Sequence, residues 1–427
     1  MKTVTVVGLG YVGLPVVCQC ASKGHKVFGF DIDKHKIDAV NAGKTPIEDE
    51  YLAEKLREFH GKIKATDKAE ECIPFSDAII VCVPTPIDKK NLPDLGALKA
   101  SVSTVAKHIK KGALLVIEST IYPGTVEEFV APILEKENMF PSKNDIFLSH
   151  CPERIDPGNK KWTIAALPRV VGGLTKEAAQ KTAEFYRSII DANILELSSV
   201  KAAEATKIME NTFRDVNIAF VNEMAKSFDK AGIDIIEVIR GASTKPFAFM
   251  PHYPGAGVGG HCIPVDPYYL IEKARQIGFE HKFLSLAREI NNSMPHYTVE
   301  LLENELSHAK KHLKNAKVGL LGLAYKANVD DKRESPAIEI LHILQAKGAD
   351  VNVFDPHVLE ESTVKSLNEL MEKSDYLVLA TDHNEFKAIN AEQLKKNEIQ
   401  VIIDGKNCLD KESIKHAGIK YHGIGRV

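Results

Sequence analysis

Short apolar runs alternate with helical patterns over the N-terminal part of the chain. Each run is followed by a stretch whose apolar residues recur at helical spacing, and turn residues separate the two. This rhythm is typical of a parallel, doubly wound sheet in which a helix follows each strand. The runs that we expect to be strands are Thr3–Val7, Lys26–Asp31, Ala78–Val83, Leu114–Glu118, Ile146–Ser149 and Val170–Gly172.

A mainly helical stretch comes next, and its longest pattern runs from Lys201 to Ala231, where Gly232 ends it. The strand rhythm then returns at Lys317–Leu321, Asp350–Phe354, Tyr376–Ala380 and Val401–Asp404, with a helix expected over Pro336–Lys347. We therefore predict an α/β protein with two Rossmann-like doubly wound domains, joined by a long central helix and a helical middle domain. The predicted domains are 1–199, 200–312 and 313–427.

The first turn of the chain carries the fingerprint of a dinucleotide site. Gly8-Leu9-Gly10-Tyr11-Val12-Gly13 follows the first strand, and Asp31 ends the second. The glycines allow a tight turn close to a pyrophosphate, the helix N-terminus binds it, and the acid accepts from the ribose hydroxyls. Asp31 would repel a 2′-phosphate, which favours NAD, although Lys34 and Lys36 nearby leave NADP open. Gly319 to Ala324 lacks the motif, so we expect no second dinucleotide site, and a mononucleotide site remains open.

A glycine-rich stretch, Pro254 to Gly260, leads to Cys262, and Asp266 follows four residues later. Backbone without side chains lets a ligand approach closely. A helix that starts near Pro264 to Pro267 would favour a thiolate at Cys262 through its amides. The alternative is a buried, inert cysteine. The surrounding glycines favour a nucleophile.

Composition limits the functions that remain. The chain has 427 residues and a net charge of −3, so nucleic acid or an anionic membrane surface is not an expected partner. An anionic substrate must be held by local cations and amides. No apolar run approaches ~20 residues, and no secretion signal opens the chain, so we expect a cytoplasmic protein. The seven cysteines lack paired spacing, which favours reduced thiols and no metal site.

Polar residues gather on one helix face and at three strand ends. Glu204, Lys207, Asn211 and Arg214 share a face of the central helix, although a solvated face is the usual explanation for such charges. The carboxyl ends of parallel strands face the ligand crevice, so Thr85, Thr120 and Glu153 should point toward a nicotinamide. Each of these three could instead be a turn or capping residue.

A dinucleotide and a cysteine together suggest a double oxidation. One oxidation turns an alcohol into an aldehyde, and a thiolate that adds to the aldehyde makes a second oxidation feasible, giving a thioester that water hydrolyses. This path needs a proton acceptor, a donor for the oxyanion and a group that guides water. Asp266, Lys207 with Asn211, and Glu153 fit these three requirements.

The chain as a whole resembles the UDP-glucose/GDP-mannose dehydrogenase family. The motifs that carry the resemblance are Gly8 to Pro15, Val83-Pro84-Thr85-Pro86, Glu118-Ser119-Thr120, Pro152-Glu153-Arg154, Lys207 to Asn211, Gly259 to Asp266, and Lys326 to Pro336. The resemblance implies that the C6 hydroxyl of a nucleotide sugar is oxidised to a uronate with two NAD, as in polysaccharide biosynthesis. It also implies that the first predicted domain binds NAD and the third binds UDP.

The resemblance further implies roles for individual residues. Cys262 is the nucleophile, Lys207 and Asp266 hold a water or proton relay, Asn211 and Lys207 stabilise the oxyanion, and Glu153 with Thr120 serves thioester hydrolysis. The implied cofactor-binding residues are Gly8, Gly10, Tyr11, Val12, Gly13, Asp31, Lys36, Pro84, Thr85, Thr120 and Arg333. The implied substrate-binding residues are Glu153, Arg154, Lys207, Asn211, Arg214, Tyr253, Gly257 and Lys326.

Substrate choice is the least determined expectation. Asn211 to Ala219 resembles the subgroup that acts on UDP-N-acetylhexosamines, and the Thr244 to Pro254 loop favours UDP-N-acetylglucosamine over UDP-N-acetylmannosamine. In mannosamine enzymes an arginine of this loop usually reaches the neighbouring subunit's substrate, and Phe247 stands about where it would be. UDP-glucose, a single-step hydroxy-acid dehydrogenase and a non-enzymatic NAD-binding module stay open as alternatives. We expect a homodimer or a higher homo-oligomer.

Overall fold

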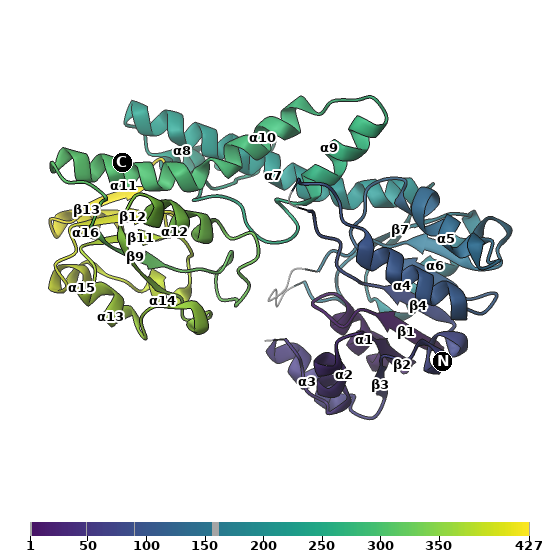
Figure 1. Ribbon diagram of the computed structural model, residues 1–427. Coiled ribbons are helices and arrows are strands. Elements are labelled where there is room, and N and C mark those ends of the chain that lie inside the picture. The colour runs from purple at the N-terminus through teal and green to yellow at the C-terminus, as the bar shows by residue number, and fades with distance from the viewer. Residues whose placement is uncertain (1, 48, 89, 156–161, 427) are drawn as a thin grey trace. The chain divides into compact units, whose positions relative to one another are not determined.

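The computed structural model describes residues 2–47, 49–88, 90–155 and 162–426 (Figure 1). The chain forms two compact units, each described by itself below. The first comprises Met1–Glu210 with Tyr268–Phe279, and the second Asn211–Pro267 with Glu280–Val427. The long helix α7 (Val200–Ala231) and helix α9 (Asp266–Gln276) both continue from one unit into the other. The three-domain boundaries stay a prediction.

The first unit is built on an eight-stranded sheet of order β3-β2-β1-β4-β5-β6-β7-β8. Its strands are β1 Thr3–Val7, β2 Lys26–Phe30, β3 Ile63–Thr66, β4 Ala78–Val81, β5 Leu114–Ile117, β6 Phe147–His150, β7 Arg169–Gly173 and β8 Ile194–Glu196. Its helices are α1 Gly13–Ser22, α2 Lys34–Asn41, α3 Glu50–Glu58, α4 Gly96–His108, α5 Ala131–Lys136 and α6 Lys176–Ile189. A π-helical turn, η3 (Val126–Val130), leads directly into α5.

Apolar side chains cover both faces of this sheet, as a doubly wound fold requires. Residues of α1, α3 and α6 pack on one face, among them Leu14, Leu56 and Phe185. Residues of α4 and α5 pack on the other face, for example Leu98 and Leu134. The carboxyl edge of the sheet is therefore the edge at which loops are open to a ligand.

The second unit has a five-stranded parallel sheet of order β10-β9-β11-β12-β13. Its strands are β9 Lys317–Leu321, β10 Asp350–Phe354, β11 Tyr376–Leu379, β12 Val401–Asp404 and β13 Lys420–Gly423. Its other helices are α8 Ile235–Ala242, α10 Lys282–Asn292, α11 Met294–His308, α12 Pro336–Ala346, α13 Leu367–Glu372, α14 Asn384–Lys387, α15 Ala391–Lys396 and α16 Lys411–His416. One core joins α11 and α12 to the sheet, and a second core joins α13, α15 and α16 to its other face (Figure 1).

The expected strands and the central helix are confirmed, mostly to within two residues. The direction of one strand is not as expected, because β7 pairs antiparallel with β6 in the otherwise parallel series from β3 to β6. Three strands were missed, namely β3, β8 and β13, and each lies at an edge of its sheet. Edge strands bury one side less completely, so their sequences lack the continuous apolar run of a central strand.

The antiparallel course of β7 brings its first residue, Arg169, to the carboxyl edge of the sheet. The guanidinium lies 3.7 Å from the carboxylate of Glu118, and both side chains are fully buried. Nη1 of Arg169 also donates to the carbonyl of Pro152 at 3.3 Å, and the hydroxyl of Tyr186 donates to Glu118. Burial raises the pKa of Glu118, while Arg169 and Tyr186 lower it. This ion pair thus joins the ends of β5, β6 and β7.

We predict that Arg169→Met lowers the free energy of unfolding of the first unit by about 3–5 kcal/mol, because it leaves the Glu118 carboxylate buried without its countercharge. Denaturant titration followed by the fluorescence of Trp162, the single tryptophan, measures this change in that unit. The control is Arg187→Met, since Arg187 pairs with Glu196 on the surface and should contribute about 0–1 kcal/mol. Equal losses in the two variants would contradict the prediction.

Candidate active site

The glycine turn after β1 has the geometry that a bound pyrophosphate needs. Gly8 has φ +97°, and a Cβ there would lie 2.8 Å from the carbonyl oxygen of Cys82. A Cβ at Gly13 would overlap the carbonyl of Gly8, whereas a Cβ at Gly10 would meet nothing within 4 Å. Gly8 therefore allows the turn, Gly13 the packing of α1 against it, and Gly10 the approach of a ligand. Tyr11 and Val12 of the turn are half-buried.

Asp31 completes this turn from the end of β2. Its carboxylate accepts from the backbone N–H of Leu9 at 2.7 Å and of Asp33 at 2.9 Å. The ammonium of Lys36 lies 3.7 Å from the same carboxylate. Lys36 is thus paired with Asp31. The residue at the expected ribose position is therefore an acid, which accepts from ribose hydroxyls and repels a 2′-phosphate. The residues present fit NAD.

The loops after β4 and β5 are hydrogen-bonded to each other. The hydroxyl of Thr85 donates to the carbonyl of Thr120 at 2.7 Å, and the hydroxyl of Tyr269 in α9 donates to the carbonyl of Thr85. Both threonines are half-buried, and Pro84 beside them is exposed. The two threonines predicted at these strand ends therefore lie together at the carboxyl edge of the first sheet.

Lys207 of α7 forms a buried ion pair with Glu153, which follows β6. The ammonium lies 3.5 Å from the carboxylate, and the two residues are 6% and 7% exposed. The other oxygen of Glu153 accepts from the backbone N–H of Ile155. Burial excludes bulk water from this pair. The two charges are therefore held in a fixed orientation and could orient a single bound water or hold a proton.

Arg154, predicted to bind substrate, is engaged within the chain. Its Nε and Nη2 donate to the carboxylate of Glu210 at 3.2 and 2.5 Å, and its Nη1 donates to the carbonyl of Pro168 at 3.0 Å. This bidentate pair fixes the loop after β6 to helix α7. The role of Arg154 in substrate binding therefore stays a prediction, and its contacts within the chain hold the loop after β6 in place.

In the second unit, Asn211 and Asp266 lie together. The side-chain amide of Asn211 donates to the Asp266 carboxylate at 2.5 Å. Asp266 is the first residue of α9, and its backbone N–H donates to the carbonyl of Cys262 at 2.9 Å. Helix α9 thus starts where the sequence predicted it, with the half-buried thiol just before its N-terminus. Arg214, one turn beyond Asn211, is exposed.

The glycine loop before Cys262 packs tightly on the segment that carries Arg333. Gly260 has φ +87°, a Cβ there would lie 2.7 Å from the ring of Tyr325, and its N–H donates to the carbonyl of Arg333 at 3.0 Å. The Arg333 guanidinium donates to the Asp331 carboxylate at 2.9 Å. Gly260 is therefore required here, because a side chain at this position would clash with Tyr325 and displace the loop.

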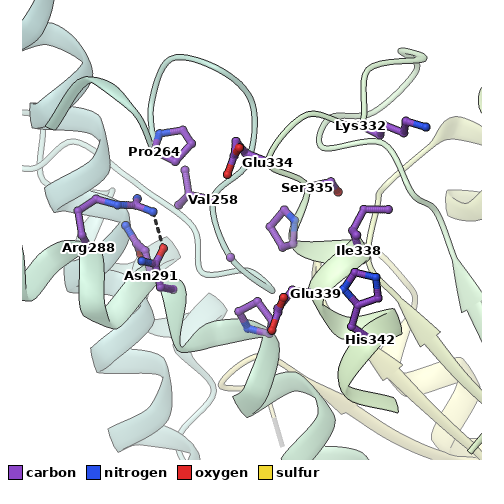
Figure 2. Close-up of a pocket in the computed structure, with 14 residues that line it drawn as sticks. Val258, Pro264, Arg288, Asn291, Lys332, Glu334, Ser335, Ile338, Glu339 and His342 are labelled. Carbon is purple, nitrogen blue, oxygen red and sulfur yellow. Dashed lines mark hydrogen bonds between the residues drawn. The ribbon is translucent and has the colours of Figure 1, made fainter. Parts of the chain in front are cut away.

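A cavity of about 480 Å³ lies beside this loop in the second unit. Figure 2 shows the residues that line it. Its lining residues are Gly257, Val258, Pro264, Arg288, Asn291, Asn292, Pro295, Lys332, Glu334, Ser335, Pro336, Ile338, Glu339 and His342. Of the predicted substrate-binding residues, Gly257 lines the cavity, whereas Tyr253 is exposed and Lys326 is half-buried outside its lining.

Sequence reasoning missed a second acid at the equivalent place in the second unit. Asp355 follows β10 as Asp31 follows β2, and it accepts from the N–H groups of Leu323 at 2.6 Å and Ala324 at 2.9 Å. Its carboxylate is fully buried against His383, whose Nε2 lies 3.1 Å away. These contacts lower the pKa of Asp355. The repeated Phe-Asp at the two strand ends was the available signal.

The sequence models of three domains of one protein family together match most of the length of the chain. The NAD binding domain of the UDP-glucose/GDP-mannose dehydrogenase family matches residues 2–190, the central domain residues 201–293, and the UDP binding domain residues 319–411. The UDP-N-acetyl-D-mannosamine dehydrogenase of Pyrococcus horikoshii is 38% identical over 99% of both chains. The chain belongs to the UDP-glucose/GDP-mannose dehydrogenase family.

Two further relatives support this result. The UDP-N-acetyl-D-glucosamine 6-dehydrogenase of Pseudomonas aeruginosa is 38% identical, over 96% of this chain and 97% of that protein. The solved structure of the P. horikoshii enzyme superposes with a TM-score of 0.93 over 99% of each chain. The predicted family, the fold class and NAD as cofactor are confirmed, and the UDP binding domain indicates a UDP-sugar substrate.

None of the helices in the described part of the chain has the length and apolar character that a membrane span requires.

Gly10→Ala and Gly13→Ala should separate cofactor binding from folding. The methyl group of Gly10→Ala meets no protein atom, so we expect an unchanged melting temperature and a KM for NAD raised at least about 10-fold, because the methyl occupies the approach of the pyrophosphate. Gly13→Ala should lower the melting temperature, since its methyl overlaps the Gly8 carbonyl. An unchanged KM for NAD in Gly10→Ala would disprove this assignment of the site.

Proposed function

We propose that this chain oxidises the C6 hydroxyl of a UDP-N-acetylhexosamine twice, with NAD as oxidant, to the corresponding uronate through a thioester on Cys262. The observation that carries the proposal is the setting of this thiol. It is half-buried after a glycine loop, and the backbone N–H of Asp266, the first residue of α9, donates to the Cys262 carbonyl. The Asp266 carboxylate in turn accepts from the side chain of Asn211.

The other six cysteines are poor alternatives for the nucleophile. Burial raises the thiol pKa of each one, to about 11 for Cys72 and about 12 for Cys18 and Cys151. Cys20, Cys82 and Cys408 are shifted in the same direction for the same reason. A protonated thiol is a weak nucleophile, so these side chains serve packing.

The residues of the chain would divide the chemistry as follows. Bound NAD supplies the hydride acceptor for each of the two oxidations. Asp266 takes up the alcohol proton through a water that it holds with Lys207, and Sγ of Cys262 adds to the aldehyde carbon to give a thiohemiacetal. Lys207 and Asn211 donate to the transient oxyanion. After the second oxidation, Glu153 and Thr120 guide the water that breaks the thioester and releases the thiol.

The sugar epimer has two candidates. Phe247 is 67% exposed in the loop where mannosamine enzymes usually carry an arginine, and the Lys245 ammonium lies 5.0 Å from its ring, which favours UDP-N-acetylglucosamine. Several relatives that match 99% or more of this chain are UDP-N-acetyl-D-mannosamine dehydrogenases, among them those of P. horikoshii and Methanococcus vannielii at 38% and 36% identity, which supports UDP-N-acetylmannosamine.

Cys262→Ser should abolish steady-state formation of the uronate, because an alcohol is a far weaker nucleophile than a thiolate and a poorer leaving group from the acyl stage. Uronate is measured by mass spectrometry, and the melting temperature shows that the fold persists. Cys408→Ser is the matched control, since Cys408 is also half-buried and its proposed role is packing. Near-normal uronate formation by Cys262→Ser would overturn the proposal.

The 2-acetamido group should be the strongest determinant of substrate choice. Its carbonyl can accept from a donor such as Arg214, and an acetamido pocket left empty costs on the order of a few kcal/mol. We expect kcat/KM for UDP-N-acetylglucosamine to exceed that for UDP-glucose by at least about 100-fold. A faster reaction with UDP-glucose would refute the subgroup, while preference for UDP-N-acetylmannosamine would replace the epimer alone.

A further inference from the structure

Helix α7 presents two buried side chains to two neighbouring strand-end loops of the first unit. Glu204 accepts from the backbone N–H of Gly124 at 2.6 Å through one carboxylate oxygen and from that of Val126 at 2.8 Å through the other. Lys207, three residues later, pairs with Glu153 in the loop after β6. Residues three apart share a helix face, so one rigid element sets the position of both loops.

The loop that Glu204 holds is the one that carries Thr120. It leaves β5 at Ile117, turns at Gly124 with φ +98°, and enters the helical segment at Val126. Thr85 binds its beginning through the carbonyl of Thr120, and Glu204 binds its end. Both carboxylate oxygens of Glu204 are thereby used on main-chain donors, and the side chain is 0% exposed.

We propose that Glu204 is a positioning residue that fixes the position of Thr120 relative to Glu153 for hydrolysis of the thioester. This inference rests on the proposed function, in which these two residues guide the hydrolytic water. Glu204 itself touches neither substrate nor cofactor in this scheme. It acts because its carboxylate fixes the Thr120 loop to the same helix turn from which Lys207 holds Glu153.

The hydrogen bonds from Gly124 and Val126 to Glu204 depend on pH, because they depend on the charge of its carboxylate. The pKa of the Glu204 carboxyl is raised to about 7, and burial is the main cause. Glu127 raises this pKa further, whereas the two N–H donors and Lys201 lower it. The charged groups around it are otherwise paired, Glu127 with Lys201 and Glu128 with Lys273, each at 2.6 Å. The ionised carboxylate accepts from both N–H groups in charge-assisted bonds, and protonation weakens both. The loop is therefore held firmly above about pH 7 and loosely below it.

Glu204→Gln tests the proposal, because the amide keeps the shape of the side chain but has only one acceptor oxygen for two donors. Rapid mixing of the full-length variant with NAD and UDP-N-acetylglucosamine gives the rate of NADH formation, and mass spectrometry of quenched samples gives the fraction acylated at Cys262. We expect NADH formation in the first turnover within about 2-fold of wild type, and hydrolysis slowed about 10- to 100-fold, so that acylated Cys262 accumulates.

Two comparisons accompany this measurement. Glu127→Gln removes a carboxylate next to the same loop that pairs with Lys201 on the surface, and it should hydrolyse the thioester at the wild-type rate. In wild-type protein the hydrolysis rate should rise with pH through about 7, and Glu204→Gln should lack this rise. The wild-type profile needs no variant and thus tests the proposal even if Glu204→Gln folds poorly.

The outcomes separate this inference from the proposed function. A wild-type protein that forms neither acylated Cys262 nor uronate with any UDP-sugar refutes the proposed function and the inference together. A wild-type protein that makes uronate while Glu204→Gln matches its hydrolysis rate and pH profile refutes the inference alone. Equal slowing of NADH formation and hydrolysis also overturns it, because a general structural role would affect both.

Discussion

A carboxylate that is buried at the end of a strand must find donors, and this requirement organises the carboxyl edges of both sheets. Asp31 and Asp355 satisfy it with backbone N–H groups of the turn after the neighbouring strand, and Glu118 satisfies it with Arg169 and Tyr186. Glu204 of helix α7 meets the same requirement with the loop after β5. Each unpaired buried charge would cost several kcal/mol. The loops therefore have little freedom to depart from the geometry that these carboxylates impose.

The two Rossmann-like units use one turn for different purposes. Gly8 and Gly322 both adopt a positive φ, and an acid from the next strand accepts from the residue that follows each glycine. In the first unit Gly10 leaves the space before α1 open. In the second unit His383 pairs with the acid, and Ala324 stands where the first turn has its second glycine.

Central strands, the glycine turn and the start of α9 could be predicted, because each depends on a local pattern of a few residues. Three of the four edge strands, β3, β8 and β13, were missed because half of their surroundings is solvent. The direction of β7 could not be predicted because the reversal of a strand depends on its partner. Arg169 escaped selection for the same reason, since only an antiparallel β7 brings its first residue beside Glu118. The contacts of Glu204 depend on a loop 80 residues away in sequence.

The stoichiometry of cofactor reduction is the most direct test of the double oxidation. Purified protein is given excess NAD and a limiting, known amount of UDP-N-acetylglucosamine, with UDP-N-acetylmannosamine in a parallel reaction, and NADH and uronate are measured at completion. We expect two NADH and one uronate for each sugar consumed, because addition of the Cys262 thiol to the aldehyde leads to a second oxidation. One NADH per sugar, with the aldehyde as product, would contradict it.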